Sequence, residues 1–229
     1  MRGARRRLFW MDPREVGRVF RVLSAIDVAD EDDWEHPPAQ ERSVSVVIKV
    51  PTPRTAVFLT KCPFQPAAQT LVRPLGRSAI MWRWGVPLPE HMHVVASVVR
   101  GLGLRQVGFL GDLDPLDLLA FVATRTYLKS HRISAKYLGV DSSMLKNVAP
   151  HWRIKMSSND HRRWTLLLRS VPECAAWIGP EAVELLHSGY KLELEGAVNP
   201  SGREPKFAKS LSGLIRDRLG RLGPFRDRT

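Results

Sequence analysis

The stretch from Gln106 to Leu119 constrains the fold of this chain more than any other. It reads Gln-Val-Gly-Phe-Leu-Gly-Asp-Leu-Asp-Pro-Leu-Asp-Leu-Leu: an apolar run that stops at Gly111, two alternating aspartates, a proline and a second apolar run. The first run predicts a buried strand, and the second predicts a helix that packs back behind it. Ligands of open α/β sheets bind beyond the carboxyl ends of the strands, where this pattern places Asp112 and Asp114.

Two interpretations of these aspartates stay open on the residues alone. Asp112 and Asp114 bring two carboxylates close together, which suits a hard cation such as Mg²⁺. Alternatively, Asp114 is the N-cap of the following helix and Pro115 is its first residue. The two interpretations are compatible, and the spacing by itself favours the helix cap.

Strand-like and helix-like segments alternate through the middle of the chain. Besides the strand before Gly111, runs of β-branched or apolar residues predict strands at Ser43–Val50, Thr55–Thr60, Ser78–Trp84 and Ile133–Leu138. Apolar residues at helical spacing predict helices at Glu90–Leu102, Leu116–Lys129 and Pro180–His187, the last with a continuation to Ala197. A capping-box pattern at Ser157–Asp160 predicts a further helix start. Such alternation predicts an α/β fold with a mainly parallel central sheet flanked by helices.

We expect three segments in the 229-residue chain, which is long enough for one sizeable core. Residues 1–42 form an N-terminal extension, with a helix opened by Asp12-Pro13 and an acidic linker that ends in two prolines. Residues 43–198 form the α/β domain. Residues 199–229 form a basic C-terminal tail.

The charge balance favours a polyanionic partner. The chain has 35 Lys and Arg against 23 Asp and Glu, a formal net charge of +12 and a pI of about 10.4. Nucleic acid is the commoner partner of such a chain, ahead of an acidic membrane surface. Lys61, Arg73, Arg77 and Arg83 surround the expected sheet ends and are candidates for binding phosphates. A solvated basic surface explains the same residues equally well.

The sequence also favours a reducing compartment. Cys62 and Cys174 lie far apart and outside any Cys-x-x-Cys spacing, which argues against a disulfide framework or structural zinc. No apolar run approaches the length that spans a bilayer, and Leu8–Met11 is too short for a signal peptide. No P-loop pattern is present either. We therefore expect a cytoplasmic, DNA-associated protein with no membrane partner.

A family resemblance adds to these observations. Gly-Asp-Leu-Asp-Pro, Gly111 to Pro115, resembles the Asp-x-Asp-Pro element of Toprim domains, the Mg²⁺-binding α/β domains of topoisomerases, primases and related nucleases. Three later elements, in the right order, resemble the topoisomerase VI A subunit family, to which the meiotic double-strand-break transesterase belongs. They are the Leu-Gly turn of Lys136–Val140 with Ser142–Leu145, the helix with Asn159-Asp160, and the run from Trp177 through Glu184–Glu193.

The resemblance spans roughly residues 85–198 and implies a Toprim-like fold, DNA binding and a role in DNA topology or double-strand breaks. It implies one Mg²⁺ at Asp112 and Asp114. Asp117 sits near the place of a glycine in the family, and its carboxylate either lends a further oxygen to the cation or faces solvent. The resemblance also implies a homodimer formed by the Toprim halves and a partner subunit, either an ATPase or a winged-helix chain. The Toprim nuclease subunit of Wadjet-type plasmid-defence systems is similar around Gly-Asp-x-Asp.

Two departures from the family weaken the catalytic expectation. The family has a glutamate at the end of the first Toprim strand, whereas here Leu59 or Thr60 stands at that place. The family's nucleophilic tyrosine lies on a winged-helix domain before the Toprim domain, whereas the three tyrosines, Tyr127, Tyr137 and Tyr190, all lie within the Toprim-like region. The position of Tyr137 in the Leu-Gly turn favours a packing role.

We therefore expect a degenerate or accessory subunit that binds DNA and lacks both the tyrosine nucleophile and the Toprim glutamate. Two alternatives remain open. One is a divalent-metal nuclease that uses Asp112, Asp114 and Asp117 in place of the missing glutamate. The other is a non-catalytic protein-interaction module.

Overall fold

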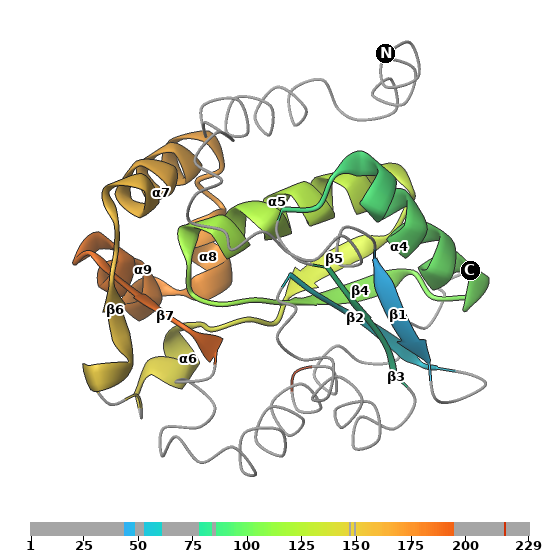
Figure 1. Ribbon diagram of the computed structural model, residues 1–229, viewed down its shortest axis with the longest axis horizontal. Helices are drawn as coiled ribbons and strands as arrows, with labels where there is room; N and C mark the ends of the chain where they lie inside the picture. The colour runs from blue at the N-terminus through green and yellow to red at the C-terminus, as the bar shows by residue number, and fades with distance from the viewer. Residues whose placement is uncertain are drawn as a thin grey trace.

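The computed structural model describes residues 44–48, 53–60, 78–83, 86–146, 148, 150–194 and 218. A five-stranded sheet with the order β1-β3-β2-β4-β5 forms its centre (Figure 1). The strands of this sheet are β1 (Ser45–Ile48), β2 (Thr55–Leu59), β3 (Ser78–Trp82), β4 (Gln106–Leu110) and β5 (Ser134–Tyr137). A separate two-stranded sheet pairs β6 (Arg153–Lys155) with β7 (Tyr190–Leu192).

The helices follow the strands in the order that the sequence predicts. They are α4 (Pro89–Gly101), α5 (Pro115–Ser130), the single turn α6 (Ser142–Leu145), α7 (Ser158–Ser170), α8 (Cys174–Ile178) and α9 (Pro180–His187), with a short 3₁₀ turn at Pro150–Trp152. β3, β2, β4 and β5 pair in parallel, and β1 pairs antiparallel with β3 at the edge. The predicted α/β class, with a mainly parallel sheet flanked by helices, is confirmed.

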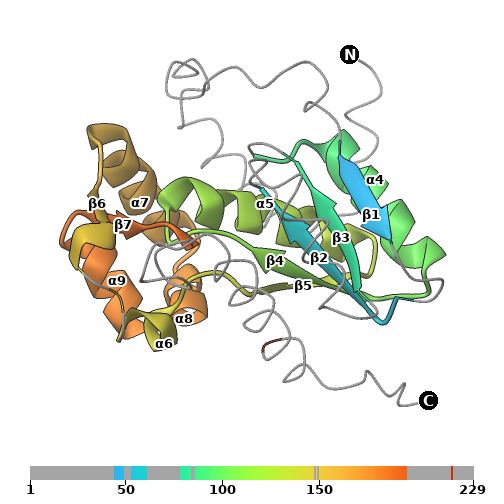
Figure 2. The same ribbon diagram turned by 60° about the horizontal axis from the view of Figure 1, so that its bottom comes forward.

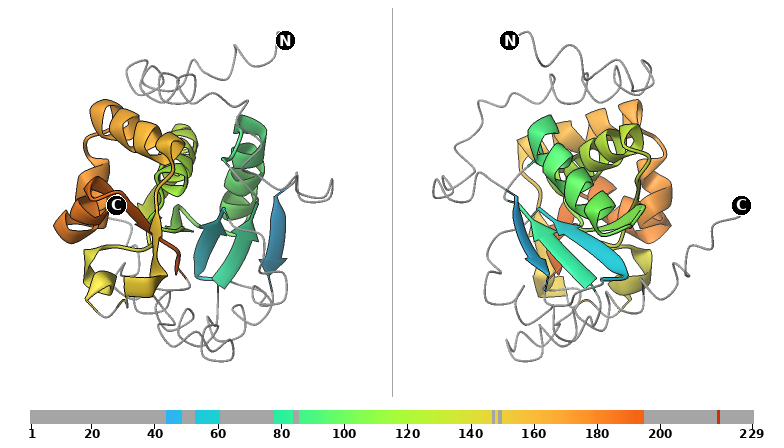
Figure 3. Two further views of the ribbon diagram at one scale, coloured as in Figure 1. Left: turned by 60° about the vertical axis from the view of Figure 1, so that its left-hand side comes forward. Right: turned by 90° about the vertical axis from the view of Figure 1, so that its right-hand side faces the viewer.

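Each face of the sheet contributes to a different hydrophobic cluster, because neighbouring residues of a strand point to opposite faces. Phe58 and Phe109 pack against buried residues of α4 and α5, such as Met92 and Phe121. Val57, Leu59 and Leu110 belong to a second cluster, which extends to buried residues of α7, α8 and α9. Figure 3 shows α4 and α5 together on one side of the sheet. β2 is buried on both faces from Ala56 to Leu59, as expected of a central parallel strand.

The C-terminal elements form a group beside the sheet. Figures 1 and 2 show α6 to α9 and the β6–β7 pair together, at the side toward which β4 runs. A bridge between Leu113 and Leu192 joins this group to the end of β4, with hydrogen bonds of 2.9 and 3.1 Å between the two backbones. The carboxyl end of the sheet therefore faces the C-terminal group.

Local sequence signals set the helix starts. The Asp114 carboxylate accepts a hydrogen bond of 2.7 Å from the Leu116 backbone N–H, and Pro115 is the first residue of α5. Ser157 and Asp160 form the reciprocal capping box of α7. Both predicted helix starts are confirmed, and each satisfies backbone donors that a helix leaves without partners.

The predicted continuation of the last helix to Ala197 is wrong. α9 ends at His187, and Gly189 adopts φ 82°, a left-handed conformation that stops a helix at little cost only for glycine. The chain then turns into β7, whose pairing with β6 replaces the helical hydrogen bonds.

Two of the three expected segments fall mostly outside the described residues. The N-terminal extension, 1–42, is wholly outside, and only Arg218 of the tail is described. The three segment boundaries therefore stay predictions. Among the described helices, none combines the length and the apolar composition needed to cross a membrane.

The close approach of Gly139 to β4 gives a first prediction. A methyl group at Gly139 would collide with the backbone carbonyl oxygen of Gly111 and with the ring of Tyr137. Gly139→Ala should therefore lower the free energy of unfolding by about 1–3 kcal/mol, the usual cost of overpacking. Urea unfolding followed by circular dichroism measures this change.

The matched control is Gly101→Ala at the end of α4, where an added methyl group meets nothing within 4 Å. It should leave stability unchanged or raise it by up to about 1 kcal/mol, because alanine is the better helix former. An unfolding midpoint for Gly139→Ala equal to that of the unsubstituted protein would contradict the close packing at this turn.

Candidate functional site at the carboxyl end of the sheet

Asp112 joins the end of β4 to two other strands. Its side chain is buried, and its Oδ1 accepts a hydrogen bond of 2.8 Å from the Leu194 backbone N–H, just beyond β7. Its backbone carbonyl accepts a bond of 2.8 Å from the hydroxyl of Tyr137 in β5. The first predicted metal ligand is thus bonded to the protein through both its side chain and its backbone.

Asp117, in the first turn of α5, joins two neighbouring parallel strands. Its Oδ2 accepts from the Asp112 backbone N–H at 2.7 Å, and its Oδ1 accepts from the Thr60 hydroxyl at 2.7 Å. Thr60 is buried at the end of β2. The family resemblance expects a glutamate there, but a glutamate would set a second negative charge against Asp117. The threonine hydroxyl supplies a donor instead.

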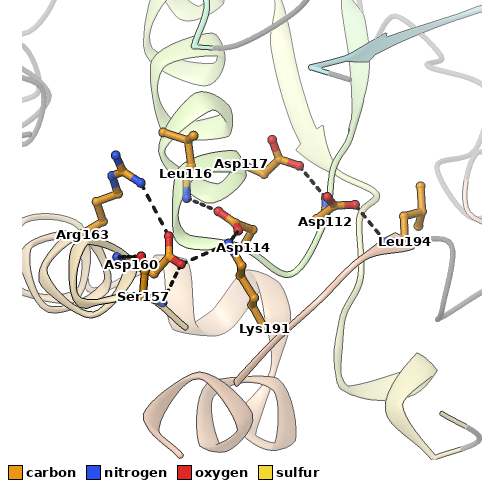
Figure 4. A network of polar contacts seen from close by, with 9 residues as sticks. All are labelled: Asp112, Asp114, Leu116, Asp117, Ser157, Asp160, Arg163, Lys191 and Leu194. Carbon is orange, nitrogen blue, oxygen red and sulfur yellow. Dashed lines mark hydrogen bonds and ion pairs between the residues drawn. The ribbon is translucent and has the colours of Figure 1, made fainter. Parts of the chain in front are cut away.

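Asp114 belongs to a network of charges. Its Oδ1 caps α5, and its Oδ2 lies 2.7 Å from Nζ of Lys191 in β7 (Figure 4). The same ammonium lies 3.0 Å from Oδ2 of Asp160, whose Oδ1 lies 3.5 Å from Arg163 Nη1. Asp160 also accepts a bond of 3.0 Å from the Ser157 backbone N–H. The network ties the first turns of α5 and α7 to β7.

The charges in this network hold one another ionised. Burial lowers the pKa of Lys191, but Asp114 and Asp160 raise it by more, so it stands above the ordinary 10.5. Burial raises the pKa of Asp160, but the Ser157 backbone N–H and Lys191 lower it by more, to below 3.8. The contribution of Asp160 to stability is lost as pH falls through its folded-state pKa, and that of Lys191 is lost as pH rises through its own. The network is therefore intact throughout the neutral range.

Asp112, Asp114 and Asp117 all lie at the carboxyl end of β4, as predicted, but they are directed to different partners. Figure 4 shows Asp112 bonded toward Leu194 and Asp114 bonded toward Lys191. Among the described residues, no group of three or more His, Cys, Asp or Glu side chains is placed to hold a metal ion. A Mg²⁺ ion shared by Asp112 and Asp114 would have to replace Lys191 as the cationic partner of Asp114. Mg²⁺ binding stays a prediction that this arrangement does not favour.

Of the four predicted phosphate-binding residues, only Arg83 is among the described residues; Lys61, Arg73 and Arg77 lie outside them. Arg83 is partly buried, with Nη1 donating to the Val86 carbonyl at 2.8 Å and lying 2.7 Å from His91 Nδ1. Burial lowers the pKa of Arg83, against the opposing effect of Glu90. Its guanidinium thus holds the turn before α4.

The tyrosines differ in their surroundings. The Tyr137 ring lies against Phe109 and Phe121, with ring centroids 6.3 and 5.4 Å away, which confirms the predicted packing role. Burial, and then the charges of Asp117 and Asp112, hold the pKa of Tyr137 well above its usual value. Tyr127 is partly buried, and burial raises its pKa too. Tyr190 is exposed on β7.

Arg218 occupies the neighbouring strand end. It donates to the carbonyls of Leu138 and Gly139, at 3.2 and 2.8 Å, and lies 2.9 Å from Oδ1 of Asp141, the N-cap of α6. Arg218 and Lys191 are not among the predicted site residues, and Thr60 was expected only to stand near the place of the family's glutamate. All three are polar residues whose partners lie far away in the chain, so no local pattern identifies them.

Comparison of the chain with known proteins found no matching family model and no matching curated protein. The Toprim resemblance therefore rests on the four sequence elements described above.

Removal of the Lys191 ammonium tests the network. Lys191→Met keeps the length of the side chain but leaves Asp114 and Asp160 without their shared cation. We expect it to lower the free energy of unfolding by about 2–3 kcal/mol, somewhat less than for a fully buried pair because Lys191 is partly exposed. Urea unfolding at neutral pH measures the loss.

The control is Lys155→Met on the adjacent strand, where the lysine is exposed and makes no ion pair among the described residues. It should change stability by less than about 0.5 kcal/mol. The deficit of Lys191→Met should also shrink as the pH is lowered into the acidic range, because Asp160 without Lys191 takes up a proton and then no longer needs a cation. Equal losses in the two variants, or a deficit that does not depend on pH, would contradict this role.

Proposed function

We propose that this protein is a DNA-binding, Toprim-like subunit that acts in an accessory role and does not cut DNA itself. The observation that supports this most is a difference between the acidic and the basic residues. Aspartates at the carboxyl end of the sheet are bonded inside the protein, as the contacts of Asp112, Asp114 and Asp117 show. Most of the exposed basic residues that the structure describes have no acidic partner among the described residues.

The described surface is accordingly basic. Its exposed acidic residues are Glu90, Glu173, Glu181 and Glu184. Its exposed Lys and Arg residues that make no ion pair within the described part of the chain are Arg54, Arg100, Arg105, Arg132, Lys136, Lys146, Arg153, Lys155, Arg162 and Arg169. Together with the net charge of +12, this surplus favours binding to phosphates.

The accessory role is supported by what stands at the catalytic places of the family. Leu59 or Thr60 stands at the place of the Toprim glutamate, and the Thr60 hydroxyl donates to Asp117. Tyr137 uses its hydroxyl within the fold, with a raised pKa that opposes formation of a phenolate nucleophile. In this proposal, an ATPase or a winged-helix partner subunit supplies the chemistry, and the Toprim-like domain forms a homodimer.

A divalent-metal nuclease is the second candidate. The observation in its favour is the closeness of Asp112 and Asp117, whose backbone N–H and Oδ2 are 2.7 Å apart at the place where α/β sheets bind ligands. It requires the hydrogen bonds from Thr60 and Leu194 to give way to a cation, which is why we place it second.

Salt dependence tests the DNA-binding proposal. Binding of a labelled DNA duplex, followed by fluorescence anisotropy in KCl from about 50 to 200 mM, should weaken steeply, because each phosphate neutralised contributes about −0.9 to the logarithmic slope. We expect a slope of about −4 or steeper. Absence of binding at the lowest salt would refute the proposal and leave the protein-interaction module as the remaining interpretation.

A cleavage assay with the same protein distinguishes the accessory role from the nuclease. Incubated with supercoiled plasmid and Mg²⁺ or Mn²⁺, the protein should leave the plasmid intact. Nicking or linearisation that disappears in Asp112→Asn, with that variant still folded by circular dichroism, would replace the accessory role with a metal-dependent nuclease.

A further inference from the structure

The β6–β7 pair presents an exposed edge on the C-terminal group. All three residues of β6, Arg153–Lys155, are exposed. β7 pairs with β6 on one side, and on the other Leu192 bridges to Leu113, so β6 is the edge of this small sheet among the described strands. Figures 1 and 2 show β6 on the far side of the group from the five-stranded sheet.

The two faces of this pair have different surroundings. Directly opposed residues of antiparallel strands project to the same face, and Lys155 is opposed to Tyr190. The next residue, Lys191, points to the other face, where it meets Asp114 and Asp160. Arg153, Lys155 and Tyr190 therefore share a face with Leu192, which lies opposite Arg153. Leu192 is buried, whereas Arg153 and Lys155 are exposed and 41% of Tyr190 is exposed.

The surroundings of this face are cationic. Between residues 142 and 172 the sequence has six Lys or Arg and a single acidic residue, Asp160. Asp160 is buried and bonded to Ser157, Lys191 and Arg163. Within the described residues, neither Arg153 nor Lys155 makes an ion pair. No carboxylate of this stretch remains to neutralise them.

We propose that this face binds a single-stranded segment of nucleic acid, with Arg153 and Lys155 on phosphates and Tyr190 stacked on a base. The inference rests on the proposed DNA binding and specifies where, and in which form, the DNA is bound. Alternate residues of a strand lie about 6.6 Å apart, so the two cations follow an extended polyanion. An exposed aromatic ring beside such cations is a platform for unpaired bases.

The exposed ring is what favours a single strand. In a duplex, both faces of a base are covered by its stacked neighbours, so Tyr190 can reach only a base that is unstacked. Basic residues on an edge strand also serve to prevent pairing with other chains. That explanation accounts for Arg153 and Lys155, but it does not account for the exposed tyrosine opposite Lys155.

The test compares two charge-matched double variants of the full chain. Arg153→Ala/Lys155→Ala removes the proposed contacts. The control, Arg105→Ala/Lys136→Ala, also removes one Arg and one Lys. Arg105 precedes β4 and Lys136 lies in β5; both are exposed and make no ion pair among the described residues. Binding to a labelled oligo-dT of about 20 nucleotides, longer than a typical single-strand site, is followed by anisotropy at several salt concentrations.

We expect Arg153→Ala/Lys155→Ala to weaken binding about tenfold or more and to flatten the logarithmic salt slope by about 1.4, that is 0.7 for each lost single-strand phosphate contact. The control removes the same charge from another part of the basic surface, so it should lose clearly less affinity than Arg153→Ala/Lys155→Ala. If the unsubstituted protein binds and the two double variants lose affinity equally, the surface lies elsewhere and this inference fails, while the proposed DNA binding stands. If the unsubstituted protein binds neither oligo-dT nor duplex, the proposed function itself fails.

Variants of Tyr190 distinguish base stacking from the attraction between charges. Tyr190→Ala should weaken oligo-dT binding about tenfold with the salt slope unchanged, whereas Tyr190→Phe, which keeps the ring, should bind like the unsubstituted protein. Thermal unfolding of each variant establishes that it is folded. If Tyr190→Ala is not folded, the comparison of Arg153→Ala/Lys155→Ala with its control still decides whether this face binds the nucleic acid. An equal loss of duplex and oligo-dT affinity in Tyr190→Ala would overturn the single-strand assignment.

Discussion

The position of the Lys191 ammonium between Asp114 and Asp160 is the interaction on which the C-terminal half of this structure depends. Two carboxylates that face each other in a partly buried place cannot both stay ionised without a cation between them. Lys191 supplies that charge and thereby fixes β7 against the first turns of α5 and α7. Once β7 is fixed, Leu192 bridges to Leu113 and the backbone of Leu194 reaches Asp112. β7 thus lies against the carboxyl end of the sheet.

The contacts of β7 at this end of the sheet affect how Gly-Asp-Leu-Asp-Pro is interpreted. The pattern is compatible with a metal site and with a helix cap, and the residues within it do not decide between them. The partners favour the helix cap: a hydroxyl from Thr60 on Asp117, a backbone N–H on Asp112 and an ammonium on Asp114. These groups donate hydrogen bonds that a hard cation would otherwise replace with its own coordination. The three carboxylates therefore hold strands and helices together through hydrogen bonds and an ion pair, which agrees with an accessory role.

Local patterns predicted the elements of the fold well, because the signals for strands and helix starts lie within a few residues. The apolar run of β4, the Asp114-Pro115 start of α5 and the Ser157 capping box are of this kind. The order β1-β3-β2-β4-β5 depends on contacts between distant segments, and no pattern in the sequence states it. The mistaken helix after His187 had a local signal against it. Gly189 is followed by apolar residues at alternate positions, at Tyr190, Leu192 and Leu194, which is the period of a strand.

The most direct test of this structural role of the aspartates is the response of thermal unfolding to Mg²⁺, with an NaCl control at the same ionic strength. If Lys191 is the resident cation, millimolar Mg²⁺ should leave the Tm of the unsubstituted protein unchanged. It should raise the Tm of Lys191→Met, in which Asp114 and Asp160 have lost their cation. A rise in the Tm of the unsubstituted protein that is absent in Asp112→Asn would contradict this account and establish the aspartates as a metal site.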